Sequence, residues 1–281
     1  MASVIKSVVS DIPNMEVLAV GSFIAAVFLL IVNAAGNHLR HLREYSGKDC
    51  LAITGLGFLG MFLYSATYYL GLSQLSSQEA CVLNYLWPAM LVIFSTILLK
   101  EHLTAKIIAA MLCSFAGVVV LSLGGGSGSG NRILGIAGCI LAAVFYGLFS
   151  VLNKKWDYDQ KLSMMLIWFT TFICASLVCT VTKQWVPIPL KSWIGIIWIG
   201  VMIDGMAYLF WALAIRGTGN TASVANLAYL TPFLSLLVSA ALLNEGIKPR
   251  AVAALILIIG GILVQNLPGR HHKVHMPAGQ R

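Results

Sequence analysis

The sequence predicts an all-α polytopic membrane protein, and two observations carry this prediction. The first is composition: of the 281 residues, 59% are hydrophobic and only 10% are charged, and the mean hydropathy is +0.87. A soluble core of this length could not bury that much apolar surface. Each long apolar stretch is close to the roughly 20 residues that a helix needs to cross about 30 Å of hydrocarbon, and a helix satisfies its own backbone groups in lipid.

The second observation is an internal repeat. The pentapeptide Asn84-Tyr85-Leu86-Trp87-Pro88 recurs in part as Ala228-Tyr229-Leu230-Thr231-Pro232, so that Pro88 and Pro232 lie 144 residues apart. One half of the chain is therefore a copy of the other. In membrane proteins such repeats are typical of transporters whose binding site lies at the repeat interface. The same displacement aligns further identical residues: Tyr64 with Tyr208, Leu98-Leu99 with Leu242-Leu243, Glu101 with Glu245, Ala109-Ala110 with Ala253-Ala254, and Gly117 with Gly261.

Apolar runs that end at charges or turn residues predict nine transmembrane helices, four in the first half (1–123) and five in the second (133–268). Residues 269–281 form a basic tail. The Gly/Ser-rich stretch at 124–132 is interpreted as a flexible linker between two bundles, because no strand precedes it and no Lys-Ser or Lys-Thr pair follows it, as a phosphate-binding loop requires. The predicted spans are 17–36, 50–71, 79–99, 105–123, 133–152, 163–182, 192–215, 219–243 and 250–267.

The span at 133–152 has no partner in the first half, because a displacement of 144 residues places that partner mostly before Met1. We therefore expect a complete unit of five plus five helices. Either this chain has lost the first helix, or the true start lies upstream of Met1. An odd number of spans in each half makes the two halves opposite in orientation, as inverted-repeat transporters require.

Positive charge predicts the orientation in the membrane. With the N-terminus outside, twelve Lys and Arg residues fall in cytoplasmic connectors or in the tail, and six fall outside. This bias follows the positive-inside rule, places the C-terminus in the cytoplasm and favours the cell (inner) membrane. It also explains the net charge of +8 without nucleic acid. The expected partners are the lipid bilayer and a small-molecule substrate, with monomer and homodimer as open alternatives.

Asp204 is the one acidic residue near the middle of a predicted span. A carboxylate at this depth is costly unless it is paired, hydrated or protonated, so we expect Asp204 to recognise a proton or a substrate amine. Tyr208 and Trp211 follow at i+4 and i+7, on the same helical face. The alternative is that a neighbouring Tyr or Asn binds the carboxyl group only to fix the packing.

The substrate site is predicted where polar and aromatic side chains gather on repeat-related spans. Pro88 and Pro232 each free a backbone carbonyl near mid-span and kink their helices, which is tolerated where the freed group lines a cavity or packed protein. Packing or an interfacial position explains any one of the aromatic residues equally well. The predicted lining consists of Tyr64, Tyr68, Asn84, Trp87, Tyr208, Trp211, Asn226 and Tyr229.

Two glutamates and six glycines are interpreted as structural. Glu101 and Glu245 each end one span just before the next begins, where they would cap the next helix or meet Lys106 and Arg250. The glycines are expected at close helix contacts. They are Gly55, Gly57, Gly60, Gly117, Gly260 and Gly261.

No motif of an enzyme is present. The sequence contains no His-Glu-x-x-His, Gly-x-Ser-x-Gly or P-loop, and its six cysteines form no CxxC pair. We therefore expect no catalytic residue, no cofactor and no metal, and we expect a gradient to drive transport.

These features resemble the drug/metabolite transporter superfamily, in members that carry two EamA repeats. The similarity covers nearly the whole chain: a short polar connector, a span with a mid-helix proline, a glutamate at the membrane edge, followed in the first half by Leu103-Thr104, and a Gly-rich last span. The pentapeptide at 84–88 resembles the branch that contains bacterial aromatic amino-acid exporters. The resemblance implies ten helices around a central cavity, cytoplasmic termini and export of amino acids or related metabolites, and the chain departs from it by lacking the first helix.

We thus expect a secondary transporter that exports a small amphipathic metabolite, with aromatic or other amino acids as the leading substrates and a proton coupled through Asp204. Efflux of hydrophobic cationic drugs is an alternative, since a single membrane acid and aromatic walls would serve it through cation–π contacts. A non-transporting structural membrane subunit is a second alternative.

Overall fold

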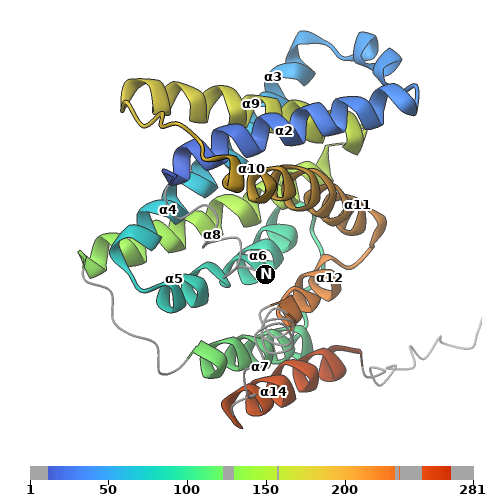
Figure 1. Ribbon diagram of the computed structural model, residues 1–281. Coiled ribbons are helices and arrows are strands. Elements are labelled where there is room, and N and C mark those ends of the chain that lie inside the picture. Colours follow the sequence, from blue (N-terminus) through green and yellow to red (C-terminus); the bar gives the residue numbers. More distant parts are fainter. Residues whose placement is uncertain (1–11, 123–129, 157, 232–233, 235–248, 267–281) are drawn as a thin grey trace, which may run out of the picture.

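A computed structural model of the chain describes residues 12–122, 130–156, 158–231, 234 and 249–266. The described residues form helices and connectors and contain no strand, so the all-α polytopic prediction is confirmed (Figure 1). In chain order the helices are α2 (Asn14–Ala35), η1 (His38–Glu44), α3 (Gly47–Leu56), η2 (Gly57–Leu63), α4 (Tyr64–Gln74), α5 (Ser77–Asn84), α6 (Trp87–Leu98), α7 (Ala105–Ser122), α8 (Arg132–Lys155), α9 (Gln160–Val181), α10 (Leu190–Trp198), η3 (Ile199–Ala207), α11 (Tyr208–Gly217), α12 (Thr221–Leu227) and α14 (Pro249–Asn266).

In the part of the chain that the structure describes, six helical segments are long and apolar enough to cross a membrane, and two shorter apolar helices accompany them. The long ones are Asn14–Ala35, Gly47–Gln74, Glu79–Leu98, Arg132–Lys155, Gln160–Val181 and Leu190–Gly217, and the shorter ones are Ala105–Val120 and Val252–Val264. The predicted span 219–243 is described only in its first part, and residues 1–11 and Glu245 lie outside the described residues.

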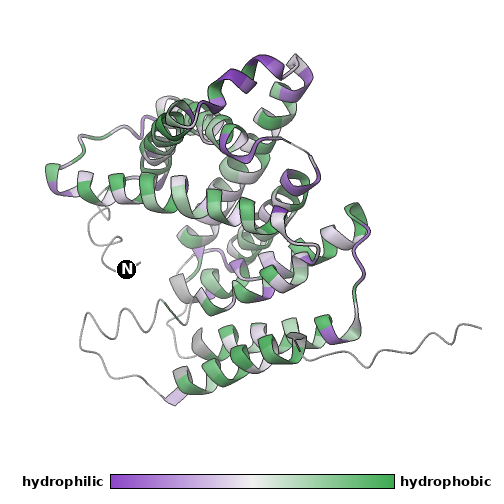
Figure 2. Cartoon of the chain, turned by 90° about the vertical axis from the view of Figure 1, so that its right-hand side faces the viewer, coloured by the Kyte–Doolittle hydropathy of each residue, from purple (hydrophilic) through white to green (hydrophobic). Residues whose placement is uncertain are grey.

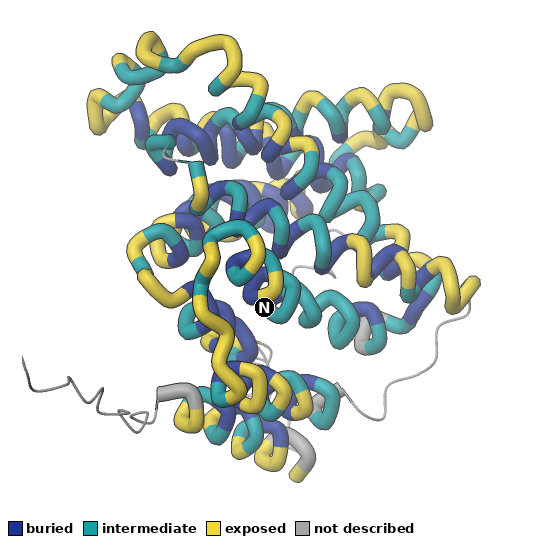
Figure 3. The backbone as a smooth tube through the Cα atoms, turned by 180° about the vertical axis from the view of Figure 1, so that it is seen from behind, coloured by how far each residue is buried: buried dark blue, intermediate teal, exposed yellow. Residues whose placement is uncertain are grey.

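Apolar side chains cover the outward faces of these helices. Leu51 is 74% exposed and Leu177 is 64% exposed, which would be costly in water but suits contact with lipid. Hydrophobic residues run along the helices, whereas hydrophilic residues gather in the connectors (Figure 2). Buried residues concentrate on the inward faces (Figure 3).

Repeat-related residues touch each other where α7 meets α14. Cys113 Sγ donates to the Leu257 carbonyl at 3.3 Å, and Ser114 Oγ donates to the Ile258 carbonyl at 3.4 Å. Each of these pairs is separated by 144 residues. Equivalent residues can touch only at the axis that relates the two halves, so this axis passes between α7 and α14.

Close backbone approach shows how these two helices run. A Cβ added at Gly117 would lie 2.8 Å from the Ala254 carbonyl oxygen, and one at Gly261 would lie 2.5 Å from the Ala110 oxygen. The helices are therefore antiparallel, and the axis is perpendicular to them, as an inverted repeat requires. The predicted close contacts are confirmed for Gly57, Gly60, Gly117 and Gly261, whereas no heavy atom of the described residues lies within 4 Å of a Cβ added at Gly55 or Gly260.

A second antiparallel pair, α2 with α9, lies on the opposite side of the molecule (Figure 1). Asn33 Nδ2 near the end of α2 donates to the Lys161 carbonyl near the start of α9 at 3.0 Å. Phe23 and Phe172 meet midway with ring centroids 5.1 Å apart. These helices are also related by the repeat. A displacement of 144 residues moves α2 (Asn14–Ala35) to 158–179, which nearly coincides with α9 (Gln160–Val181).

Helices of the two halves interleave, while most of the predicted linker lies outside the described residues. Helix α8 of the second half packs between α4 and α6 of the first half. A Cβ at Gly138 would lie 2.8 Å from the Thr67 carbonyl oxygen, and one at Gly147 would lie 2.8 Å from the Leu91 nitrogen. Because glycines let the backbones approach this closely, α8 becomes the central helix of the molecule.

Helix irregularities occur at matching places in the two halves. Helix α5 ends at Asn84 and α6 begins at Trp87. In a continuous helix the ring of Pro88 would clash with the carbonyl four residues earlier, which is that of Asn84, and the helix breaks at this residue. The predicted kink is thus present at Pro88, while Pro232 lies outside the described residues. The π-helical segments η2 and η3 interrupt the repeat-related spans 50–71 and 192–215, and such segments are frequent at functional sites.

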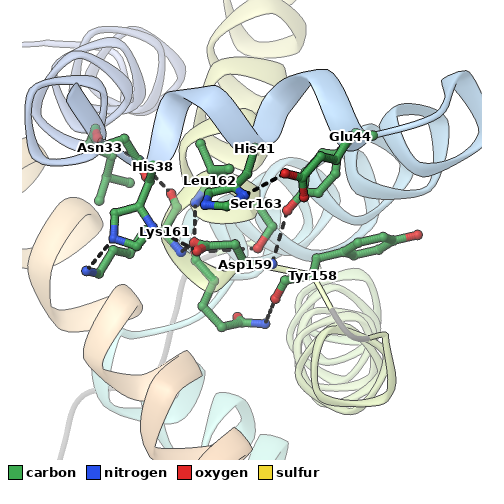
Figure 4. A network of polar contacts seen from close by, with 12 residues as sticks. Asn33, His38, His41, Glu44, Tyr158, Asp159, Lys161, Leu162 and Ser163 are labelled. Carbon is green, nitrogen blue, oxygen red and sulfur yellow. Dashed lines mark hydrogen bonds and ion pairs between the residues drawn. The ribbon is translucent and has the colours of Figure 1, made fainter. Parts of the chain in front are cut away.

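A polar network fastens the connector after α2 to the start of α9 (Figure 4). His38 Nδ1 lies 3.0 Å from Asp159 Oδ2, and Lys161 Nζ lies 3.1 Å from His38 Nε2. The Asp159 backbone N–H donates to the Tyr45 hydroxyl at 3.0 Å. These contacts hold the connector that follows α2 against the start of α9.

Candidate functional site

Tyr146 on α8 is the centre of an aromatic cluster. Its ring centroid lies 5.1 Å from that of Tyr64, 4.9 Å from that of Trp87 and 5.9 Å from that of Tyr208. Trp87 in turn meets Trp211 edge to face at 5.1 Å. The rings come from α4, α6, α8 and α11, so the cluster joins both halves of the chain.

Tyr64 and Tyr208 also meet on the axis that relates the two halves, as α7 and α14 do. They are separated by 144 residues, and their side chains are in polar contact. Tyr68 stacks on Tyr64 with ring centroids 6.2 Å apart, and Asn84 Nδ2 donates to the Tyr64 hydroxyl at 3.3 Å. The aromatic cluster therefore sits where the repeat interface was predicted to hold the binding site.

A pocket of about 430 Å³ opens beside the cluster. This volume lies in the range of about 300–1,000 Å³ that is usual for small-molecule sites. Among the lining residues that the structure describes there is no acidic or basic side chain, and their polar side-chain atoms belong to Tyr, Trp and Thr. The lining consists of Trp87, Tyr146, Ala207, Tyr208, Phe210, Trp211, Ala214, Val224, Leu227, Ala228 and Thr231.

The eight predicted lining residues separate into three groups. Trp87, Tyr208 and Trp211 line the pocket. Tyr64, Tyr68 and Asn84 are not among the lining residues. Tyr64 packs against Tyr146, which lines the pocket, and Tyr68 and Asn84 contact Tyr64. The last two, Asn226 and Tyr229, are buried on the other face of α12 and in the turn that follows it, and Tyr229 packs against Tyr85 and Phe115.

Asp204 lies in η3 and is 8% exposed. Its Oδ2 points at α2, where a Cβ added at Gly21 would lie 3.2 Å away. No ion pair found among the described residues involves Asp204. Tyr69 and Tyr208 lie within electrostatic reach of its carboxyl group. Because Tyr208 also lines the pocket while Asp204 does not, the acid sits behind the pocket wall rather than in it.

Glu101 binds residues of the second half, and these partners were not predicted. Lys154 Nζ donates to Glu101 Oε1 at 2.8 Å, and the Thr221 backbone N–H donates to Oε2 at 3.0 Å. The Thr221 hydroxyl donates to Oε1 at 2.6 Å. The cap of α7 comes instead from Thr104, whose hydroxyl accepts from the Ile107 N–H.

Burial alone would raise the pKa of Glu101, but hydrogen bonds from Lys154 and Thr221 outweigh it and lower the pKa below the ordinary value of 4.5. A lowered carboxyl pKa stabilises the folded state above the unfolded value, and this contribution is lost as pH falls through the folded value. We expect the thermal midpoint of the purified protein to exceed that of Glu101→Gln by a constant amount from pH 7 to about 4.5, and the difference to shrink below that. A difference that does not change down to pH 3 would contradict this.

Sequence reasoning missed Tyr146 and the partners of Glu101. Tyr146 belongs to the span that has no repeat partner in this chain, so no alignment of the halves points to it; its position near the middle of span 133–152 was the one available signal. Lys154 and Thr221 lie 53 and 120 residues from Glu101, and no local pattern links them.

Comparison with known proteins agrees with this architecture. The model of the EamA-like transporter family matches residues 1–123 and 133–267. A solved structure is similar over 95% of this chain and 91% of its own, with a TM-score of 0.84 and 22% sequence identity, which establishes the fold.

The curated relatives are named as transporters. The uncharacterized transporter YyaM of Bacillus subtilis (strain 168) is 26% identical over 85% of this chain and 79% of its own length. The aromatic amino acid exporter YddG of Ancylobacter novellus is 27% identical over 78% of this chain and 76% of its own. A probable terminal-alkyne amino-acid exporter of Streptantibioticus cattleyicolor is 21% identical over 80% of this chain and 76% of its own.

Proposed function

Because the chain belongs to the EamA-like transporter family, we propose that it exports a small amphipathic metabolite, with aromatic amino acids as the leading substrates. The observation that supports this most is the pocket beside Tyr146, whose described lining is largely aromatic and apolar and includes no acidic or basic side chain. Aromatic rings favour an aromatic or apolar side chain through stacked and edge-to-face contacts. Two of the relatives are named as amino-acid exporters, which supports the same substrate class.

Asp204 supplies the proposed coupling site. Its carboxyl group is buried next to Gly21, and Tyr208 stands between it and the pocket. A proton taken up by Asp204 removes the cost of a charge at this depth, and Tyr208 can transmit that change to the pocket wall. A substrate amine in the pocket would meet Tyr208 and Trp211 first, so proton coupling is better supported than amine recognition.

The orientation follows from the charges. The face that holds the network of His38, Asp159 and Lys161 also carries Lys154 and Arg216, which makes it the more basic face of the described chain. By the positive-inside rule we assign this face to the cytoplasm of a cell (inner) membrane, with export toward the opposite face.

Flux measurements in membrane vesicles test this function. Everted vesicles that contain the protein should accumulate labelled Phe or Trp when a proton gradient is imposed, and unlabelled aromatic amino acids should compete. Asp204→Asn should abolish the dependence on the gradient, because the amide cannot bind the proton. Flux of a labelled hydrophobic cation alone would favour drug efflux, and flux of neither class would favour the structural subunit.

A further inference from the structure

A second pocket lies in line with the aromatic pocket. It has a volume of about 390 Å³ and is lined by Val92, Ser95, Thr96, Leu99, Lys100, Glu101, His102, Leu103, Gly219, Asn220 and Ala222. Helices α6 and α12 contribute to both pockets. Along α6 the order is Trp87 and then Thr96, and along α12 it is Ala222 and then Leu227, so the two pockets lie at opposite ends of one seam between antiparallel helices.

Tight apolar packing closes the seam between the two pockets. Leu91 and Val92 on α6 belong to one buried cluster with Ala222 and Ala225 on α12. Leu91 and Ala225 are 0% exposed. A substrate could pass from one pocket to the other only if α12 moved away from α6.

Polar contacts fasten α12 at the first residue of this seam. Thr221, where α12 begins, binds both carboxylate oxygens of Glu101 and also accepts from Lys154 Nζ at 2.8 Å. Lys154 donates further to the Thr218 carbonyl at 2.9 Å. The side chains of Lys154 and Glu101 are only 14% and 18% exposed, so solvent screens these contacts weakly. One cluster thus joins the connector after α6, the end of α8 and the start of α12.

Resting on the proposed transport function, we propose that Glu101, Lys154 and Thr221 form a latch that holds α12 against α6 and so closes the aromatic pocket toward the face that carries connector 99–104. Opening the latch lets α12 swing away, which joins the two pockets and admits substrate from that face. The three residues act through α12 and are positioning residues, since none of them lines the aromatic pocket.

The repeat does not reproduce this latch residue by residue. Glu101 has a counterpart in Glu245, but the positions 144 residues before Lys154 and Thr221 are Ser10 and Ser77. The ammonium group that crosslinks the cluster is therefore absent from the equivalent positions of the other half. Closure at the Lys154 end therefore rests on a cluster that the repeat does not duplicate, and the substrate or proton must supply the free energy that opens it.

Thiol labelling measures the latch without any knowledge of the substrate. A cysteine at Val224, which lines the aromatic pocket, is treated with a membrane-impermeant maleimide from the face of connector 99–104, and the signal of the chain without V224C is subtracted. We expect Glu101→Gln and Lys154→Met to raise the labelling rate about tenfold, because hydrogen bonds to charged groups shift a two-state equilibrium by about this factor. Lys154→Arg, which keeps the charge and the donors, should stay near the parent rate.

A matched control removes a carboxylate from another ion pair. Glu79 lies 3.5 Å from Arg132, at the opposite end of α8 from Lys154, and Glu79→Gln should leave the labelling unchanged. If Glu101→Gln fails to fold, Thr221→Val removes only one hydroxyl and tests the same point. Unchanged labelling in all the latch variants overturns the proposal. Raised labelling in a protein that moves no substrate would keep the latch and reject the transport function.

Discussion

Gly261→Leu should prevent the protein from folding to a monodisperse state. A Cβ at this position would lie 2.5 Å from the Ala110 carbonyl oxygen and 2.2 Å from Ser114 Oγ, and a backbone oxygen cannot move aside as a flexible side chain can. Overpacking of this kind costs about 1–3 kcal/mol or more. Because α7 and α14 meet on the axis that relates the halves, the damage falls on the contact that both repeats share.

The neighbouring glycine is the matched control for this prediction. Gly260 lies on the same helix, and an added Cβ there meets no described residue within 4 Å, so Gly260→Leu should keep the parent elution profile and thermal midpoint in detergent. Gly117→Leu, at the repeat-related position, should behave like Gly261→Leu. Equal behaviour of the Gly260 and Gly261 variants would show that α7 and α14 do not pack as described.

Tyr146→Leu should weaken substrate binding and flux about tenfold or more, since each aromatic pair contributes about 0.5–1.5 kcal/mol and this ring makes several of them. Tyr146 touches Tyr64, Trp87 and Tyr208 and lines the pocket, so its removal also loosens two other walls. Leucine keeps much of the apolar volume, which limits the loss of stability. Binding is measured by quenching of the tryptophan fluorescence and flux by the vesicle assay.

Tyr146→Phe is the control, because it keeps the ring and removes only the hydroxyl group. We expect its binding and flux to stay within about twofold of the parent, since the ring contacts carry most of the interaction. A Tyr146→Leu protein that binds and transports at the parent level, with a normal thermal midpoint, would exclude this pocket as the substrate site.

Local sequence determined the helices and their relationship. Composition and the length of the apolar stretches decide that a chain spans the membrane, because each helix satisfies its own backbone and needs no distant partner. The displacement of 144 residues between Pro88 and Pro232 could also be found in the sequence. The same displacement pairs Tyr64 with Tyr208, which meet on the axis that relates the two halves. The break before Pro88 was predictable for the same local reason, the missing N–H and the clash with the preceding turn.

The tertiary structure alone decided which helices are neighbours. Gly55 and Gly57 look alike in sequence, yet only Gly57 faces another backbone, because helix rotation is set by all the contacts at once. The same holds for α8, which crosses into the first half and brings Tyr146 into the pocket, and for Lys154, which reaches Glu101 across 53 residues. Membrane insertion is a property of single segments, so the sequence alone predicted an all-α membrane protein. The candidate site is made of side chains from several segments, so only their packing decided which residues meet there.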